Sequence, residues 1–122
     1  MAKLIRSSDQ VCVVERLKFA NSYFTRLRGL IGLKKFEFGE GLLFPRCNNI
    51  HMWMMSIPID VVFLKSSSKS NSKEWTVLSV HAHLKPWKIL PVGNSKADDV
   101  LELPAGLIQS ISLKTGEVLC IA

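Results

Sequence analysis

The chain has 122 residues and a mass of 13.7 kDa, the size of one domain with a core of its own. Hydrophobic residues make up 48% of it, and 16 basic against 10 acidic residues give a formal net charge of +6. The basic residues are scattered and no nucleic-acid motif accompanies them, so we expect no specific nucleic-acid partner.

The first third of the chain contains the only helical pattern. A Val-rich run at residues 11–15 predicts a strand. Apolar residues at three- and four-residue spacing then predict a short N-terminal helix near residues 22–31, between a serine that can cap it and a C-terminal glycine. Two glycines predict a turn at residues 39–41, and the apolar residues 42–44 predict a strand after it.

The rest of the chain consists of short strands and their connections. Polar residues at 65–74 predict a hairpin loop, and prolines with a glycine predict an irregular stretch at 86–98. Many short strands with one helix are typical of a mainly β fold, a single compact antiparallel β-barrel or sandwich of jelly-roll type over residues 1–122. The predicted strands are residues 50–55, 59–65, 75–84, 99–103 and 117–121.

The cysteines and the apolar runs indicate in which cellular compartment the protein is expected. Cys12, Cys47 and Cys120 are odd in number and not closely paired, which argues against a disulfide scaffold. Cys12 and Cys120 lie in apolar runs, where a free cysteine acts as a small core residue. No apolar run approaches the roughly 20 residues that a membrane span needs, and no signal-peptide pattern is present. We therefore expect a cytoplasmic protein without a membrane partner.

Several segments of the chain, in order, resemble the domain of unknown function 192 family. That family is a set of uncharacterised small β-rich proteins, so the resemblance implies a jelly-roll or barrel fold and implies no activity. The matching segments are residues 26–32 (Arg-Leu-Arg-Gly-Leu-Ile-Gly), 39–44 (Gly-Glu-Gly-Leu-Leu-Phe), 50–54 (Ile-His-Met-Trp-Met), 57–64 (Ile-Pro-Ile-Asp-Val-Val-Phe-Leu), 86–88 (Pro-Trp-Lys) and 100–106 (Val-Leu-Glu-Leu-Pro-Ala-Gly).

Asp60 interrupts an otherwise apolar strand, where an unpaired charge is costly to bury. In a structural interpretation, Asp60 is buried and accepts hydrogen bonds from backbone amides or from Arg28. In a functional interpretation, Asp60 and Glu102 face a common pocket and act in acid–base chemistry or ligand binding. The structural interpretation is favoured.

Two groups of residues suggest a metal site, and both have a simpler explanation. His51 lies among three methionines, which would suit Cu(I), but alternate residues of a strand point to opposite faces. His81 and His83 would lie on one strand face, where they could chelate zinc with a third ligand. Methionines as core residues and exposed or hydrogen-bonded histidines are favoured, so we expect no metal and no cofactor.

The function remains open between classes. Cys47 with His51 could be a nucleophile and its base, but no acyl-transfer motif is present. The favoured hypothesis is a small-ligand-binding β domain, because aromatic walls with a few polar groups are typical of ligand pockets. The alternatives are a hydrolase-type enzyme that uses Asp60, Glu102 and His51, or a protein-interaction module with a basic face. The expected ligand-binding residues are His51, Trp53, Asp60, Trp87, Glu102 and Arg28.

Overall fold

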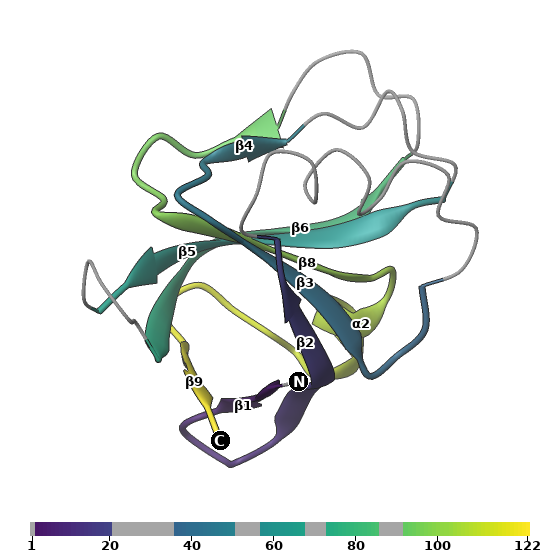
Figure 1. Ribbon diagram of the computed structural model, residues 1–122. Helices are drawn as coiled ribbons and strands as arrows, with labels where there is room; N and C mark the ends of the chain where they lie inside the picture. The colour runs from purple at the N-terminus through teal and green to yellow at the C-terminus, as the bar shows by residue number, and fades with distance from the viewer. Residues whose placement is uncertain (1, 21–35, 51–56, 68–72, 86–91) are drawn as a thin grey trace.

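Seven strands close into a β-barrel (Figure 1). The computed structural model describes residues 2–20, 36–50, 57–67, 73–85 and 92–122. In order around the barrel, the strands are β1 (Ala2–Arg6), β2 (Cys12–Phe19), β3 (Glu40–Pro45), β8 (Asp99–Pro104), β5 (Ile59–Ser66), β6 (Glu74–Leu84) and β9 (Val118–Ile121). The prediction of a mainly β barrel is confirmed, and the helix expected near residues 22–31 lies outside the described residues.

Three further elements lie outside the barrel wall. The short strands β4 (Asn49–Ile50) and β7 (Val92–Gly93) form a separate antiparallel pair. The helix α2 (Leu107–Ser110) follows β8. Sequence analysis predicted neither α2 nor β7, because a one-turn helix and a two-residue strand are too short to show a period. No helix among the described residues is long and apolar enough to cross a membrane.

The barrel departs from the antiparallel prediction at one pair of strands. β2 runs parallel to β3, whereas every other pair in the barrel is antiparallel. Parallel neighbours need a long connection, and residues 20–39 lie between these two strands. The apolar pattern of a strand contains no information on the direction of its partner, so the sequence could not show this.

The predicted turn at residues 39–41 is shorter than expected. Gly39 has a φ of +102° and makes the turn, but Gly41 belongs to β3. A Cβ atom on Gly41 would lie 2.8 Å from Val14 Cγ2, so β3 approaches Val14 too closely for a side chain. The second glycine thus marks a close contact between two strands and not a turn.

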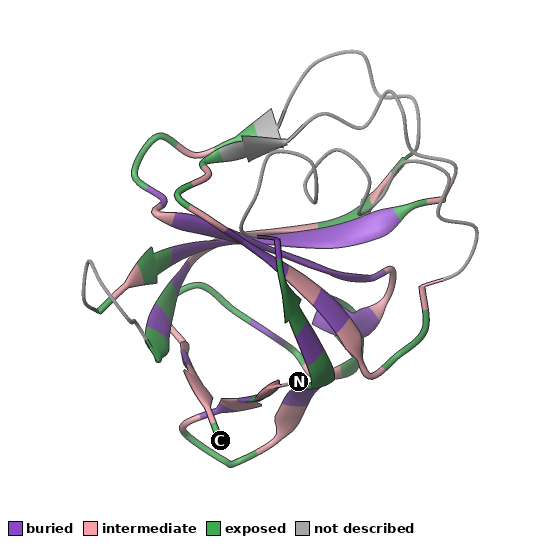
Figure 2. Ribbon diagram, in the orientation of Figure 1, coloured by how far each residue is buried: buried purple, intermediate pink, exposed green. Residues whose placement is uncertain are grey.

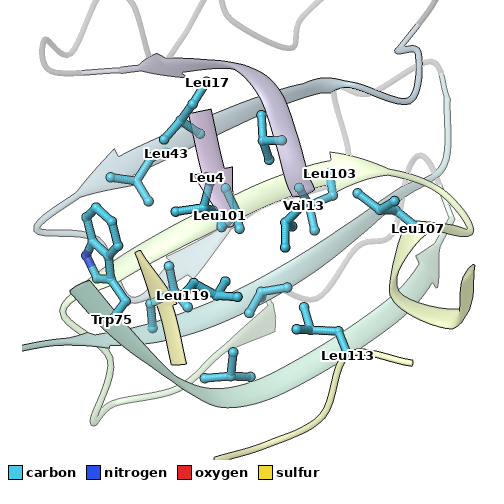
Figure 3. Packing of buried hydrophobic residues seen from close by; sticks show 14 of the residues in the cluster. Leu4, Val13, Leu17, Leu43, Trp75, Leu101, Leu103, Leu107, Leu113 and Leu119 are labelled. Atoms are coloured by element: carbon cyan, nitrogen blue, oxygen red, sulfur yellow. The ribbon is translucent and has the colours of Figure 1, made fainter. Parts of the chain in front are cut away.

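One face of every barrel strand contributes to the interior, which we call the barrel core. The labelled side chains of this cluster lie between the strands in Figure 3, with Trp75 and Leu107 toward opposite ends of the view. Alternation sends every second residue of a strand into this core, except on β2, where the adjacent residues Val13 and Val14 both belong to it. Its members are Leu4, Val13, Val14, Leu17, Leu43, Val62, Leu64, Trp75, Val77, Leu101, Leu103, Leu107, Ile108, Leu113 and Leu119.

A second apolar cluster lies on the outside of the barrel wall, and we call it the outer cluster. Phe44, Val61, Phe63 and Val100 come from β3, β5 and β8, at positions that alternate with those of the barrel core. β5 and β8 are therefore buried on both faces, as the continuous buried bands in Figure 2 show. The other members are Ala20, Ile59 and Ala97.

Cys12, Cys47 and Cys120 form no disulfide in the described part of the chain, and none of them is fully buried. Cys12 and Cys120 are half-buried, so their expected place in the core is wrong. Cys12 lies on β2 and Cys120 on β9, each next to a residue of the barrel core. Their side chains therefore point to the outer face of the barrel, where they reach the surface. Cys47 is also half-buried and packs against the outer cluster.

A buried hydrogen bond joins β6 to β8 at one end of the barrel core. Trp75 Nε1 donates to Asp99 Oδ2 at 2.6 Å, and Asp99 Oδ1 accepts from the backbone amide of Arg46 at 3.0 Å. Both side chains are buried, so the indole and the carboxylate satisfy each other away from water.

We predict that Trp75→Phe lowers the free energy of unfolding by about 1–3 kcal/mol, because the buried Asp99 oxygen loses its donor. Urea unfolding of Trp75→Phe, Asp99→Asn and the double variant measures this. The losses in the two single variants should not add, since both remove one interaction. Fully additive losses would contradict the assigned role of the hydrogen bond.

Candidate functional site

Two of the six expected ligand-binding residues lie in the described structure, Asp60 on β5 and Glu102 on β8. Both are buried. The other four lie outside the described residues: Arg28, His51, Trp53 and Trp87.

Asp60 is fully buried and its carboxylate is bound by the backbone. Oδ1 accepts from the amide of His83 at 2.8 Å, and Oδ2 accepts from the amides of Gly106 at 3.1 Å and Ile108 at 2.8 Å. Hydrogen bonds from backbone amides to a carboxylate are stronger than hydrogen bonds between two neutral groups. Here they satisfy three amides, one each from β6, from the turn after β8 and from α2. The structural interpretation of Asp60 is confirmed, with backbone amides as its partners.

Local backbone geometry aims these amides at Asp60. Gly106 stands at the N-cap of α2 with a φ of +95°, and it has no side chain to cap the helix. The Asp60 carboxylate takes that role from the neighbouring strand, since the first amides of a helix have no partner within it. β5 thereby holds the turn and the helix that follow β8.

A β-bulge in β6 supplies the third amide. Ile59 pairs with Leu84 and Val61 with His81, so Ala82 and His83 together oppose the single residue Asp60. His83 has a φ of +51°, a conformation that is uncommon outside glycine. Bulges redirect backbone groups in this way, and this one turns the His83 amide toward the carboxylate.

The same bulge overturns the expectation that His81 and His83 share a strand face. Val61 and Ile59 lie on one face of β5, so their partners His81 and Leu84 share that face. The extra residue shifts the alternation by one, which puts His83 on the opposite face, beside Gly106. The two imidazoles therefore do not form a chelating pair, and the described residues contain no group of three metal-binding side chains.

Glu102 lies on the other face of the barrel wall from Asp60. Glu102 pairs with Leu42 and Val61, which belong to the outer face, whereas Asp60 pairs with Leu103 of the barrel core. The common pocket considered for Asp60 and Glu102 is therefore wrong, and the two carboxyl groups do not form an acid–base pair. The sequence could not show this, because it does not contain the register between β5 and β8.

The carboxyl group of Glu102 is buried, and one of its oxygens has no partner in the described part of the chain. The residue is 2% exposed, and its Oε2 has no hydrogen-bond partner among the residues that the structure describes. Burial raises the pKa of Glu102 to about 8, since an apolar environment disfavours the ionised form. At neutral pH this side chain is predominantly a neutral carboxylic acid, which can donate one hydrogen bond and accept others.

One row of side chains crosses the outer face through Glu102. Cross-strand pairing lines up Leu42, Glu102, Val61 and His81 on four adjacent strands. At a strand spacing of about 4.8 Å, Glu102 and His81 are about 10 Å apart at their Cα atoms, with Val61 between them. The His81 ring also packs edge-on against Phe63, with centroids 5.3 Å apart and an interplanar angle of 88°.

This row is the candidate site, and sequence analysis found only part of it. Glu102 was among the expected residues, but His81 was considered only as a metal ligand, and Val61 and Leu42 only as strand residues. The pairing of strands β3, β8, β5 and β6 brings them together. No pattern along the chain could have shown it, because each member comes from a different strand.

We predict that Asp60→Ala lowers the free energy of unfolding by about 3 kcal/mol or more, because three amides lose a charged acceptor. Urea unfolding measures the loss, and amide hydrogen exchange should accelerate at His83, Gly106 and Ile108. A matched control is Asp98→Asn, at a partly exposed ion pair with Lys65 that should contribute less than about 1 kcal/mol. Equal losses in both variants would contradict the anchoring role of Asp60.

Glu102 should make the stability depend on pH. The folded state holds the Glu102 proton up to a pKa of about 8, whereas the unfolded chain releases it near 4.5. Relative to Glu102→Gln, the wild-type protein should lose about 1.4 kcal/mol of stability per pH unit between these two values. The loss should stop below and above that window.

Urea unfolding of both proteins from pH 4 to pH 9 measures this difference. Glu15→Gln makes the same substitution at an exposed position of β2 and reports what the substitution itself does. A constant difference between wild type and Glu102→Gln across the range would mean that Glu102 is not buried as a neutral acid.

Comparison with known proteins identifies relatives but no activity. A UPF0127 protein of Thermococcus sibiricus is 31% identical over 107 residues, which are 84% of this chain and 63% of that protein. A UPF0127 protein of Thermococcus kodakarensis is 28% identical over 112 residues, 85% of this chain and 63% of that protein. The chain thus spans less than two thirds of the length of these curated relatives.

Solved structures share the fold at low sequence identity. A proposed transcription regulator of Sinorhizobium meliloti 1021 superposes with a TM-score of 0.78 at 21% identity, over 98% of this chain and 91% of that one. A protein of unknown function of Novosphingobium aromaticivorans gives a TM-score of 0.77 at 20% identity, over 96% and 82%. The profile of the domain of unknown function 192 family, described as "Uncharacterized ACR", matches residues 4–121. The chain belongs to this family of uncharacterised proteins, as its motifs predicted.

Proposed function

We propose that this domain binds a small molecule against the outer face of its barrel, with Glu102 as the polar contact. The observation that carries the proposal is the buried Glu102 Oε2, which has no partner among the described residues. A buried polar atom without a hydrogen bond destabilises a folded protein by about 1–3 kcal/mol. Such a group is explained when it pairs with a ligand that is present only part of the time.

The surroundings of Glu102 suit a ligand with an apolar body. Its neighbours in the row are Leu42 and Val61, and the next row along the same face contains Phe44, Val100 and Phe63. Apolar and aromatic walls with one or a few polar groups are the usual composition of small-molecule sites. His51, Trp53 and Trp87 remain proposed members of the ligand's surroundings, as expected from the sequence.

Asp60 has no part in this proposal, although it was an expected ligand contact. Its two carboxylate oxygens already accept three amides, and it faces the barrel core. Glu102 alone of the two acidic residues combines burial with an unused oxygen. This favours binding over a hydrolase that would need both residues at one site.

We also propose that the protein is cytoplasmic. The support is that Cys12 and Cys120, both half-buried, are free thiols. Free thiols persist in the reducing cytoplasm, whereas secreted domains of this size tend to pair them.

A panel of probes that share a benzene ring tests the ligand site. Phenylacetamide, phenylacetate, benzyl alcohol and benzyltrimethylammonium differ only in the polar end, and each is titrated into isotope-labelled protein at pH 6 and pH 9.5. We expect at least one probe to cause saturable shifts in the NMR signals of Leu42, Val61 and Glu102.

Matched variants on one strand decide whether Glu102 is the contact. Glu102→Leu should abolish the saturable shifts, because it removes the polar contact while keeping an apolar side chain. Leu103→Met, at the next position of β8 but facing the barrel core, should leave them unchanged. Binding of no probe, or equal binding to Glu102→Leu, would refute the proposed function.

A further inference from the structure

Two ring side chains lie beside the backbone of Gly106, at the end of the barrel where α2 begins (Figure 1). A Cβ atom on Gly106 would lie 3.9 Å from Phe38 Cζ and 3.9 Å from His83 Nε2, which are ordinary van der Waals distances. A group at that point therefore contacts both rings at once. Phe38 is 55% exposed and His83 is also exposed, so both rings are open to solvent.

The backbone beside these rings is fixed by Asp60, whose carboxylate accepts the amides of His83 and Gly106. The φ of +51° at His83 is one that glycine adopts without steric cost and other residues do not. Any residue except proline would supply the same amide to Asp60. The amide therefore does not explain why a side chain stands in this unfavourable conformation, and conformations of this kind cluster at functional sites.

The guanidinium of Arg16 lies beside the turn that contains Phe38. Its Nη2, Nη1 and Cζ atoms would lie 3.1, 3.3 and 3.5 Å from a Cβ atom on Gly39, whose carbonyl accepts the Arg16 amide at 2.8 Å. The cross-strand neighbour Glu40 accepts the Glu37 amide, and no carboxylate among the described residues forms an ion pair with Arg16. A positioned guanidinium with unused donors is suited to bind a phosphate or carboxylate.

We infer that this end of the barrel binds a flat aromatic ring that bears an anionic group, a phosphate or a carboxylate. The ring lies over Gly106 in contact with Phe38 and His83, and the anionic group accepts hydrogen bonds from Arg16. Stacking on aromatic side chains stabilises flat rings even at exposed surfaces, and a net charge of +6 favours an anion. This site lies apart from the row of Glu102 and does not depend on the function proposed there.

The chain also sets the distance between the two parts of the ligand. Phe38 directly precedes Gly39, on which the guanidinium of Arg16 packs, and its ring reaches Gly106. The anionic group and the ring are therefore separated by about the length of one phenylalanine side chain. Aryl phosphates and nucleotides both meet this description.

Probes with and without each part of the ligand test the inference. Phenyl phosphate and adenosine monophosphate have both parts, phenol and adenosine lack the anion, and cyclohexyl phosphate and ribose phosphate lack the flat ring. We expect at least one complete probe to cause saturable shifts in the amide NMR signals of Gly39, His83 and Gly106. It should bind about fivefold or more tightly than both of its incomplete counterparts, and the better complete probe distinguishes an aryl phosphate from a nucleotide.

Single substitutions assign the binding to the three side chains. Phe38→Ala, His83→Gly and Arg16→Gln should each weaken the better probe about fivefold or more. Two exposed positions of β2 give matched controls, Phe19→Ala for the lost ring and Lys18→Gln for the lost charge. Both controls should leave the affinity unchanged.

His83→Gly separates binding from a structural role. Glycine keeps the amide that Asp60 accepts and removes the steric cost of the positive φ, so the urea midpoint should stay the same or rise while the affinity falls. A lower midpoint would mean that the imidazole serves the fold, and it would contradict the inference.

The probes can also overturn the inference directly. Failure of both complete probes to bind would remove the site. Equal affinity for cyclohexyl phosphate or ribose phosphate would mean that only the anion is bound, and equal affinity for phenol or adenosine would mean that only the ring is bound. Binding that survives Phe38→Ala or Arg16→Gln unchanged would place the ligand elsewhere.

Discussion

The Asp60 carboxylate is the interaction on which the local architecture around β5 depends. It is fully buried, and three amides from the β6 bulge, the turn after β8 and the start of α2 converge on it. The positive φ of His83 is unfavourable for a residue with a side chain, whereas Gly106 adopts its positive φ without steric cost. The carboxylate satisfies the amides that both conformations turn toward it. α2 in turn places Leu107 and Ile108 in the barrel core, so one charged side chain links three elements to the apolar interior.

The register that aims Asp60 inward also aims its neighbours outward. Adjacent residues of a strand point to opposite faces, so Val61 and its partner Glu102 lie on the outside of the wall. The two acidic residues of this part of the sheet thus have opposite environments. Asp60 is satisfied by the backbone, whereas Glu102 has an oxygen without a partner in the described structure and a raised pKa. The contrast separates a group that stabilises the fold from one whose burial the described structure does not compensate, which is why we propose Glu102 as the ligand contact.

Much of the fold could be predicted from the chain because strands with one or two buried faces have a recognisable composition. The bounds of β5, β6, β8 and β9 agree with the predicted runs within a residue or two. β1 was not predicted, since Ala2–Arg6 contains two basic residues. Its Arg6 is buried with partners from distant parts of the chain, Glu117 and the Ile111 carbonyl, besides the nearby Asp9. The expectation that His81 and His83 share a strand face was wrong because a bulge in β6 lies between them, and a bulge leaves no periodic pattern in the sequence.

The sequence by itself determined the family, the mainly β class, the burial of Asp60 and the candidacy of Glu102. These follow from composition, ordered motifs and the energetic cost of an acidic residue in an apolar strand. Only the tertiary structure decided which strands are neighbours, that β2 and β3 run parallel, and that Asp60 and Glu102 lie on opposite faces. The physical reason is that strand register and direction arise from hydrogen bonds between segments far apart in the chain, and a local pattern contains no record of them.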